Sequence, residues 1–290
     1  MAFSKDTFNM TDLELFEARL QADASVIIDR ARQTARFTVF DIEYAYDREG
    51  QRRADHHAAD PRKEAVFDMA GGPGCADNDN KYIVSWPFHR IVCISAMTLA
   101  VVPSGIAVEG FETFSRPEMT EAGIVQAFAS LVDRNHSAVP VTWGGEYKDL
   151  PALLAVAMRE GFGLPASLAS GLWQHARLDL ADRLRSKGKP VHLNEYAHSQ
   201  GLPAKLMAPW MLGEAAERGK WSSIREHCEC DVTVTAMLLA RWLLATGVLK
   251  GDRGAIDTRI ADAVAKARPY RPALLKAIVG FTSAPVTLYA

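Results

Sequence analysis

The pattern of hydrophobic and polar positions along the chain predicts buried strands alternating with amphipathic helices. Residues 36–44 (RFTVFDIEY) have the β-branched and aromatic density of a buried strand. Residues 81–114 read as two or three further strands with a turn at 103–105, and 138–143 as another short strand. A short strand is also predicted at 175–180, and helices at 11–32, 119–134, 150–160, 193–200, 221–247 and in two stretches after 254. Such an alternation is typical of an α/β fold.

Two carboxylates interrupt the first predicted strand. Asp41 and Glu43 are two residues apart, so their side chains project from the same face. Two ionised carboxylates this close repel each other, and burial increases the cost unless a proton or a cation lies between them. Mg²⁺ and Mn²⁺ take oxygen ligands, so the strand indicates a metal site. The alternative is a solvated edge strand, because the same Asp-x-Glu spacing also occurs at 12–14 and 47–49, outside any apolar strand.

Further candidate residues lie at the ends and on the faces of predicted helices. Asp149 follows a buried strand and is predicted to cap the helix that begins after it. Ser223 and Glu226 have the spacing of a capping box at the start of the last long helix. On that helix His227 and Asp231 are four residues apart and therefore share a face.

The predicted elements divide the chain into three parts. Residues 1–35 are expected to form an N-terminal helical extension, and residues 36–247 the main domain. Residues 47–80, rich in Arg, Asp, His, Gly and Asn, are predicted to be an irregular insertion in that domain. Residues 248–290 are expected to form a C-terminal helical extension.

Composition restricts the classes of function. The 290 residues are 48% hydrophobic and 23% charged, which is typical of a globular protein. A formal net charge of -2 argues against nucleic-acid binding by bulk charge, but not against an enzyme whose acids are offset by bound metal. No apolar stretch has the length needed to cross a bilayer, and the start of the sequence has acids where a signal peptide has an apolar core. With cysteines that show no framework spacing, we expect a cytoplasmic protein with no membrane partner.

Three short motifs resemble those of the ribonuclease H-like 3′-5′ exonucleases with four catalytic acids, the DEDD group. The residues of these motifs most resemble those of stand-alone bacterial proteins similar to the exonuclease domain of family B DNA polymerases. Residues 40–43 (FDIE) match the end of the first signature. Residues 142–153 match the second, roughly T-F-N-G-x-x-F-D-L-P-x-L, and 227–235 match the third, roughly Y-C-x-x-D-V-x-x-T. The resemblance covers residues 36–247.

The resemblance implies a mixed central sheet flanked by helices and a two-metal 3′-5′ exonuclease that uses Mg²⁺ or Mn²⁺. It implies that Asp41 bridges both ions, that Glu43 and Asp231 complete the first, and that Asp149 helps to hold the second. It also implies that His227 orients or deprotonates the attacking water, because an imidazole titrates near neutral pH.

Nucleic acid with single-stranded 3′ ends is the expected substrate, DNA in the first place. Tyr44 and Trp143 offer aromatic faces on which bases can stack, and Lys148 offers a positive charge to a phosphate. RNA is an alternative substrate, and the oligomeric state stays open.

Departures from the motifs leave other interpretations open. Gly144 stands where the family has Asn, Lys148 where it has an aromatic residue, and His227 where it has Tyr. They support an alternative in which the fold binds nucleic acid or a protein partner with weak or no catalysis. His175 and Asp179 have the same spacing as His227 and Asp231 and are a second candidate for the third motif. A zinc module built from His227, Cys228 and Cys230 is a third idea, although residues this close diverge around a helix.

Overall fold

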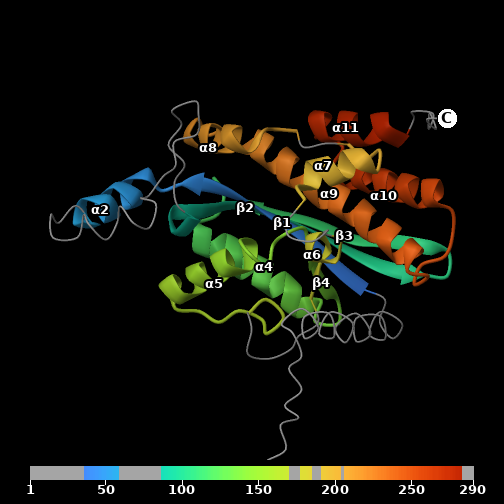
Figure 1. The fold of residues 1–290 in the computed structure, drawn as a ribbon, viewed down its shortest axis with the longest axis horizontal. Helices are drawn as coiled ribbons and strands as arrows, with labels where there is room; N and C mark the ends of the chain where they lie inside the picture. Colours follow the sequence, from blue (N-terminus) through green and yellow to red (C-terminus); the bar gives the residue numbers. More distant parts are fainter. Residues whose placement is uncertain (1–35, 59–85, 170–176, 185–190, 204–205, 283–290) are drawn as a thin grey trace, which may run out of the picture.

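The computed structural model describes residues 36–58, 86–169, 177–184, 191–203 and 206–282 (Figure 1). A five-stranded sheet with the order β3-β2-β1-β4-β5 forms its centre. β1 and β2 are antiparallel, as are β2 and β3, whereas β4 runs parallel to β1 and β5 parallel to β4. The strands are β1 (Arg36–Tyr46), β2 (His89–Val102), β3 (Gly105–Ser115), β4 (Val139–Thr142) and β5 (Leu178–Asp179). This mixed sheet with its flanking helices confirms the predicted ribonuclease H-like α/β class.

Helices cover both faces of the sheet (Figure 1). One face carries α4 (Glu121–Arg134) and α5 (Asp149–Glu160), and the other carries the long helix α9 (Trp221–Ala245). None of the helices in the described ranges is long and apolar enough to cross a membrane. The other helices are α2 (Arg48–Ala58), α6 (Leu180–Leu184), α7 (Leu193–Ser199), α8 (Pro209–Glu217), α10 (Arg253–Ala267), α11 (Pro272–Thr282) and the 3₁₀ turn η2 (Trp86–Phe88).

The alternation of side chains along β1 divides the core in two. Phe37 and Val39 pack in the cluster that contains the buried face of α9, and Phe40 and Ile42 pack in the cluster of α4 and α5. Since successive side chains of a strand point to opposite faces, the odd-numbered Asp41 and Glu43 lie on the α9 side.

The edge of β1 that faces β4 is paired over only part of its length. The pairing covers residues 37–39 of β1 and residues 139–141 of β4. β1 then continues to Tyr46, whereas β4 ends at Thr142. Beyond Val39, this edge of β1 therefore has no strand beside it within the described residues, and space opens next to the carboxyl end of the strand.

The structure corrects part of the predicted insertion. Residues 48–58 form α2, where we predicted irregular structure. Asp47 explains the helix, because its carboxylate accepts from the backbone N–H of Gly50 (2.7 Å) and its carbonyl from that of Gln51 (3.0 Å). The hydrogen bond from the Gly50 N–H and the nearby Arg90 guanidinium hold the pKa of the Asp47 carboxyl below its usual value. The rest of the insertion and the predicted helix at 11–32 lie outside the described residues, and the division of the chain into three parts stays a prediction.

Both predicted helix caps are wrong. α5 begins at Asp149 itself, with Lys148 as the residue before it. α9 begins at Trp221, and Glu226 accepts instead from the backbone N–H groups of Ala273 (2.9 Å) and Leu274 (3.3 Å) at the start of α11. The N-terminal N–H groups of a helix need acceptors, and a side chain from another helix supplies one here. Helix α8 was not predicted.

Candidate active site

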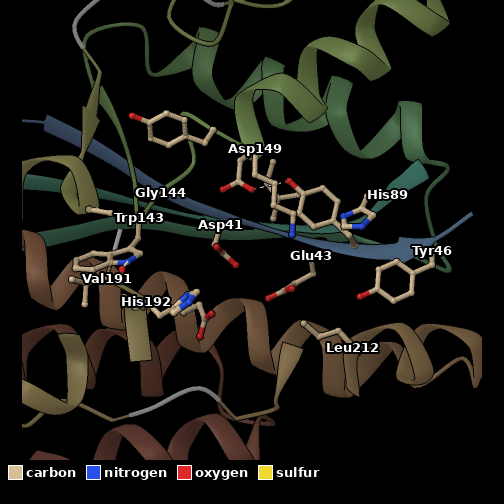
Figure 2. Close-up of a pocket in the computed structure, with 17 residues that line it drawn as sticks. Asp41, Glu43, Tyr46, His89, Trp143, Gly144, Asp149, Val191, His192 and Leu212 are labelled. Carbon is tan, nitrogen blue, oxygen red and sulfur yellow. Dashed lines mark hydrogen bonds between the residues drawn. The ribbon is translucent and has the colours of Figure 1, made fainter. Parts of the chain in front are cut away.

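The four predicted acids line one cavity of about 660 Å³ at the carboxyl end of β1. β1 supplies Asp41 and Glu43, the first turn of α5 supplies Asp149, and α9 supplies Asp231. Figure 2 shows Asp149 on the α5 side of β1, with Asp41 and Glu43 pointing toward the opposite side. Three elements far apart in the sequence thus bring carboxylates into one space.

Burial makes the ionised form of these acids energetically unfavourable without a cation. Glu43 and Asp149 are buried, and Asp231 is only 1% exposed. Ligand atoms of Glu43, His227 and Asp231 all lie within 4.8 Å of one another. Asp149 belongs to no such group among the described residues and reaches the cavity from the α5 side. Buried carboxylate oxygens at this spacing suit a hard divalent cation, because its charge offsets their repulsion.

Tyr44 holds the carboxylate of Asp149. Its hydroxyl donates to Asp149 Oδ1 at 2.7 Å. Burial and the nearby Asp149 carboxylate raise the pKa of Tyr44 well above its usual value, so the hydroxyl stays protonated at neutral pH. Lys148 Nζ lies 4.3 Å from the centroid of the Tyr44 ring. Tyr44 and Lys148 both line the cavity, and their predicted contact with substrate stays a prediction.

For the phosphodiester cleavage that the sequence resemblance implies, we expect Tyr44→Phe to lower kcat/KM about 10- to 100-fold, because a hydrogen bond to a charged group contributes about 1.5–3 kcal/mol. The melting temperature of the variant checks that the fold is kept. Tyr270→Phe is the matched control, since Tyr270 is exposed and does not line the cavity. Wild-type kcat/KM for Tyr44→Phe would contradict the role of its hydroxyl.

His227 lies behind Glu43 instead of at the surface of the cavity. Its side chain is 0% exposed, and it does not line the cavity. Nδ1 accepts from the backbone N–H of Met207 at 3.3 Å, and Nε2 lies 3.5 Å from Glu43 Oε1. The imidazole predicted to act on water is therefore sealed between Met207 and Glu43.

The cysteines of the suggested zinc module point to different parts of the core. Cys228 packs with residues of α8, and Cys230 packs in the cluster between the sheet and α9. The Cys228 thiol donates to the backbone carbonyl of Asp41 at 3.4 Å, and burial raises its pKa well above the usual value. A protonated thiol that already makes a hydrogen bond does not favour the zinc hypothesis.

Comparison with known protein families identifies the chain. The model of the family described as predicted 3′-5′ exonucleases related to the exonuclease domain of PolB matches residues 81–271. The chain belongs to this exonuclease family. The match begins after β1, so Asp41 and Glu43 lie outside it.

This exonuclease is similar to a solved polymerase structure. The family B DNA polymerase from the hyperthermophilic archaeon Pyrobaculum calidifontis is 15% identical, with a TM-score of 0.45. The alignment covers 87% of the exonuclease chain and 27% of the polymerase chain, so the exonuclease spans only about a quarter of that relative. No curated protein matches the chain.

Asp179 fixes the segment of the exonuclease that leads to Asp149. Its carboxylate accepts from the backbone N–H groups of Gly144 (2.8 Å), Glu146 (3.1 Å) and Ala181 (3.0 Å). Gly144 has a φ of 73°, a left-handed conformation that glycine adopts without steric cost. Asp179 was the alternative acid of the third motif, but its oxygens serve the backbone here, and its proposed partner at position 175 lies outside the described residues.

We expect Asp179→Ala to lower the free energy of unfolding by about 2–3 kcal/mol, because it leaves several N–H groups without their acceptor. Asp179→Asn keeps one carbonyl oxygen and is expected to lose less. Urea unfolding of both variants measures the difference. Equal stability of the alanine variant and the wild type would show that these hydrogen bonds do not fix the segment.

Several cavity residues were not predicted from the sequence. His89 lies 5.7 Å from the Tyr44 ring and 5.2 Å from the Tyr46 ring, measured between centroids, and all three line the cavity. His192 and Leu212 reach it from the segments around α7 and α8 (Figure 2). These residues have no characteristic spacing from the acids, so only the fold brings them to the site.

Trp143 has both a cavity face and structural contacts. Its indole Nε1 donates to the backbone carbonyl of Val191 at 3.0 Å, and its ring lies 5.1 Å from that of Tyr196. It also lines the cavity, so the side chain remains available for the predicted contact with substrate. Trp143 thereby fixes the segment that enters α7 against the end of β4.

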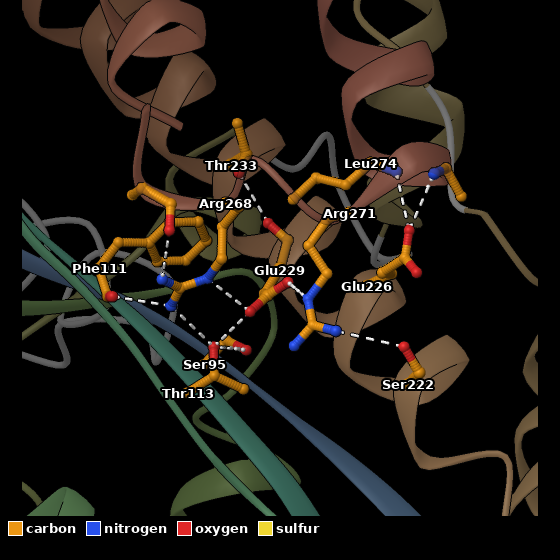
Figure 3. Close-up of polar contacts among 12 residues, drawn as sticks. Ser95, Phe111, Thr113, Ser222, Glu226, Glu229, Thr233, Arg268, Arg271 and Leu274 are labelled. Carbon is orange, nitrogen blue, oxygen red and sulfur yellow. Dashed lines mark hydrogen bonds and ion pairs between the residues drawn. The ribbon is translucent and has the colours of Figure 1, made fainter. Parts of the chain in front are cut away.

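A buried ionic cluster lies on the face of α9 opposite to His227 and Asp231 (Figure 3). Glu229 is 0% exposed and lies about half a turn around the helix from His227 and Asp231. Its carboxylate accepts from Arg268 Nε (2.7 Å), Arg271 Nε (3.2 Å) and Thr113 Oγ1 (2.9 Å). The cluster joins α9 to β3 and to the segment between α10 and α11. It therefore limits rotation of the helix that carries Asp231.

Proposed function

We propose that this exonuclease hydrolyses phosphodiester bonds at single-stranded 3′ ends of nucleic acid, with DNA as the first candidate. The observation that carries the proposal is the meeting of carboxylates from β1, α5 and α9 in one cavity of about 660 Å³. Membership of the exonuclease family supports the reaction class. Because the acids come from separate elements, they can surround a phosphate on more than one side.

The proposed roles of the acids follow their places in the cavity. Glu43 and Asp231 would hold one cation, Asp149 would hold a second, and Asp41 would contact both. When bound, Mg²⁺ or Mn²⁺ ions supply an activated water and stabilise charge on the leaving 3′-oxygen. Tyr44 keeps Asp149 oriented by its 2.7 Å hydrogen bond.

The dimensions and lining of the cavity support an unpaired terminal nucleotide as the substrate. Cavities of about 300–1,000 Å³ hold small ligands, so this one suits a nucleotide but not a duplex. Trp143 offers an aromatic face, and Tyr147, 68% exposed, offers another at the rim. Lys148 is exposed beside them and would attract a phosphate. Stacking on every base and a charge for the backbone give binding with little sequence preference.

A 5′-labelled oligonucleotide tests the proposal. The full chain is incubated with single-stranded DNA or RNA of the same sequence in Mg²⁺, in Mn²⁺ or with excess chelator. We expect a ladder that shortens from the 3′ end, release of nucleoside 5′-monophosphate and no product with chelator. The ratio of the DNA and RNA rates decides between the two substrates.

Other outcomes of this assay separate the alternatives. Binding of an intact oligonucleotide would favour a catalytically weak member of the family, an interpretation supported by Gly144, Lys148 and His227. If the protein neither cleaved nor bound DNA or RNA, this result would contradict the proposal.

A further inference from the structure

Two histidines lie close to the acids in opposite environments. His227 is fully buried and does not line the cavity. His192 is exposed and lines the same cavity as Asp41 and Asp231. Figure 2 shows the His192 ring directed into the cavity that Asp41 and Glu43 enter from the other side. Of these two, His192 is the one that can meet a substrate without a rearrangement of the core. His89 also lines the cavity, on the side of the Tyr44 and Tyr46 rings.

The hydrogen bond of His227 determines its neutral form. Nδ1 accepts the backbone N–H of Met207, so its lone pair is used and the ring proton must be on Nε2. Nε2 lies 3.5 Å from Glu43 Oε1, so a proton on Nε2 has that carboxylate as a near neighbour. No basic nitrogen of His227 remains for a water molecule in the cavity. A protonated nitrogen at this distance suits a residue that helps to position Glu43, whose carboxylate is proposed to bind metal.

His192 is fixed at the edge of the cavity by contacts on both sides. It precedes the first residue of α7, and its backbone N–H donates to Glu195 Oε2 at 3.3 Å. The preceding residue, Val191, accepts from Trp143 Nε1 at 3.0 Å. The backbone is thereby attached to α7 on one side and to the end of β4 on the other. The imidazole thus lines the same cavity as the acids and is exposed to solvent.

We propose that His192 is the catalytic imidazole of this exonuclease and that His227 is a positioning residue for Glu43. The inference rests on the proposed function. In the hydrolytic step, the oxygen of water forms a bond to phosphorus, and the bond from phosphorus to the 3′-oxygen of the preceding nucleotide breaks. A ring nitrogen of His192 takes the proton of the water, and the leaving 3′-oxygen takes a proton from solvent. The products are a nucleoside 5′-monophosphate and a strand one nucleotide shorter.

Chemical rescue tests the role of His192 in the full chain. We expect His192→Ala to lower kcat for oligonucleotide cleavage about 10²-fold, within the range that general acid–base groups contribute. Added imidazole should restore part of this rate, because the side chain it replaces is open to solvent. His198→Ala is the matched control, since His198 is exposed on the same helix and does not line the cavity. The control should keep the wild-type rate with and without imidazole.

Metal affinity tests the role of His227. We expect His227→Leu to weaken Mn²⁺ binding about tenfold, the effect typical of groups that orient a metal ligand. His227→Gln, which can still direct an N–H toward Glu43, should recover part of that affinity. Calorimetric titration with Mn²⁺ measures both variants without relying on activity, and His192→Ala should bind Mn²⁺ like the wild type. Imidazole should not rescue His227→Leu, because the position is sealed.

The outcomes separate this inference from the proposed function. If the wild type cleaves and folded His192→Ala cleaves at the same rate, the assignment of His192 is wrong and the exonuclease proposal stands. Rescue of His227→Leu by imidazole, or unchanged Mn²⁺ affinity in that variant, would overturn the positioning role. If the wild type itself cuts neither DNA nor RNA, the proposed function fails first.

Discussion

Asp41→Asn is expected to reduce phosphodiester cleavage at least about 10³-fold, because metal ions supply several kcal/mol of transition-state stabilisation and each 1.36 kcal/mol is tenfold in rate. Asp41 lines the cavity together with the other acids, and its carboxylate is the one proposed to contact both ions. The substitution also removes one negative charge from a crowded group. Without metal, the variant is therefore expected to melt at the wild-type temperature or above it.

Two measurements make this prediction specific. The cleavage assay should show the loss of rate, and the rise in melting temperature that Mn²⁺ produces in the wild type should become smaller. Asp133→Asn is the matched control, since Asp133 is exposed on α4. Full activity of Asp41→Asn would remove the central acid from the proposal, and a lower melting temperature without metal would show a structural role instead.

Glu229→Ala is expected to lower the free energy of unfolding by about 3 kcal/mol, the low end of the cost of removing one partner from a buried ion pair. Arg268 and Arg271 would lose their common acceptor, although their side chains, 18% and 21% exposed, can regain some water. The low end of the range follows from that exposure. Because the cluster limits rotation of α9, a loss of cleavage rate should accompany the loss of stability.

Urea unfolding of matched variants checks the cluster. Glu229→Gln keeps one oxygen acceptor and is expected to lose less stability than the alanine variant. Glu118→Gln removes a surface partner of Arg225 and should cost less than about 1 kcal/mol, as exposed ion pairs do. If Glu229→Ala cost no more than Glu118→Gln, the buried cluster would have no special part in holding α9.

The elements nearest the site could be predicted because their signals are local. The apolar density of β1 identified the strand, and its period of two predicted that Asp41 and Glu43 share a face. The period of α9 likewise placed His227 and Asp231 together. Wherever a contact lies within one strand or one helix, its spacing is present in the sequence.

Contacts between distant elements could not be predicted in this way. Glu226 has the spacing of a capping box, but the first turn of α11 is its actual partner. Nothing in the sequence near His227 indicates that Met207 and Glu43 enclose it, or that His192 lines the cavity. Which histidine is buried depends on how the helices and the sheet pack, and His192 and His227 belong to different segments of the chain.

The alternation along β1 also determines where the chain tolerates insertions and deletions. Loss of one residue between Phe37 and Phe40 would turn Asp41 and Glu43 toward α4 and α5, because a shift of one reverses every side chain that follows. The segment from β4 to α5 has no strand register to keep, but the Asp179 carboxylate holds the N–H groups of Gly144 and Glu146. Length variants among natural or engineered relatives should therefore spare both the first strand and the segment that Asp179 holds.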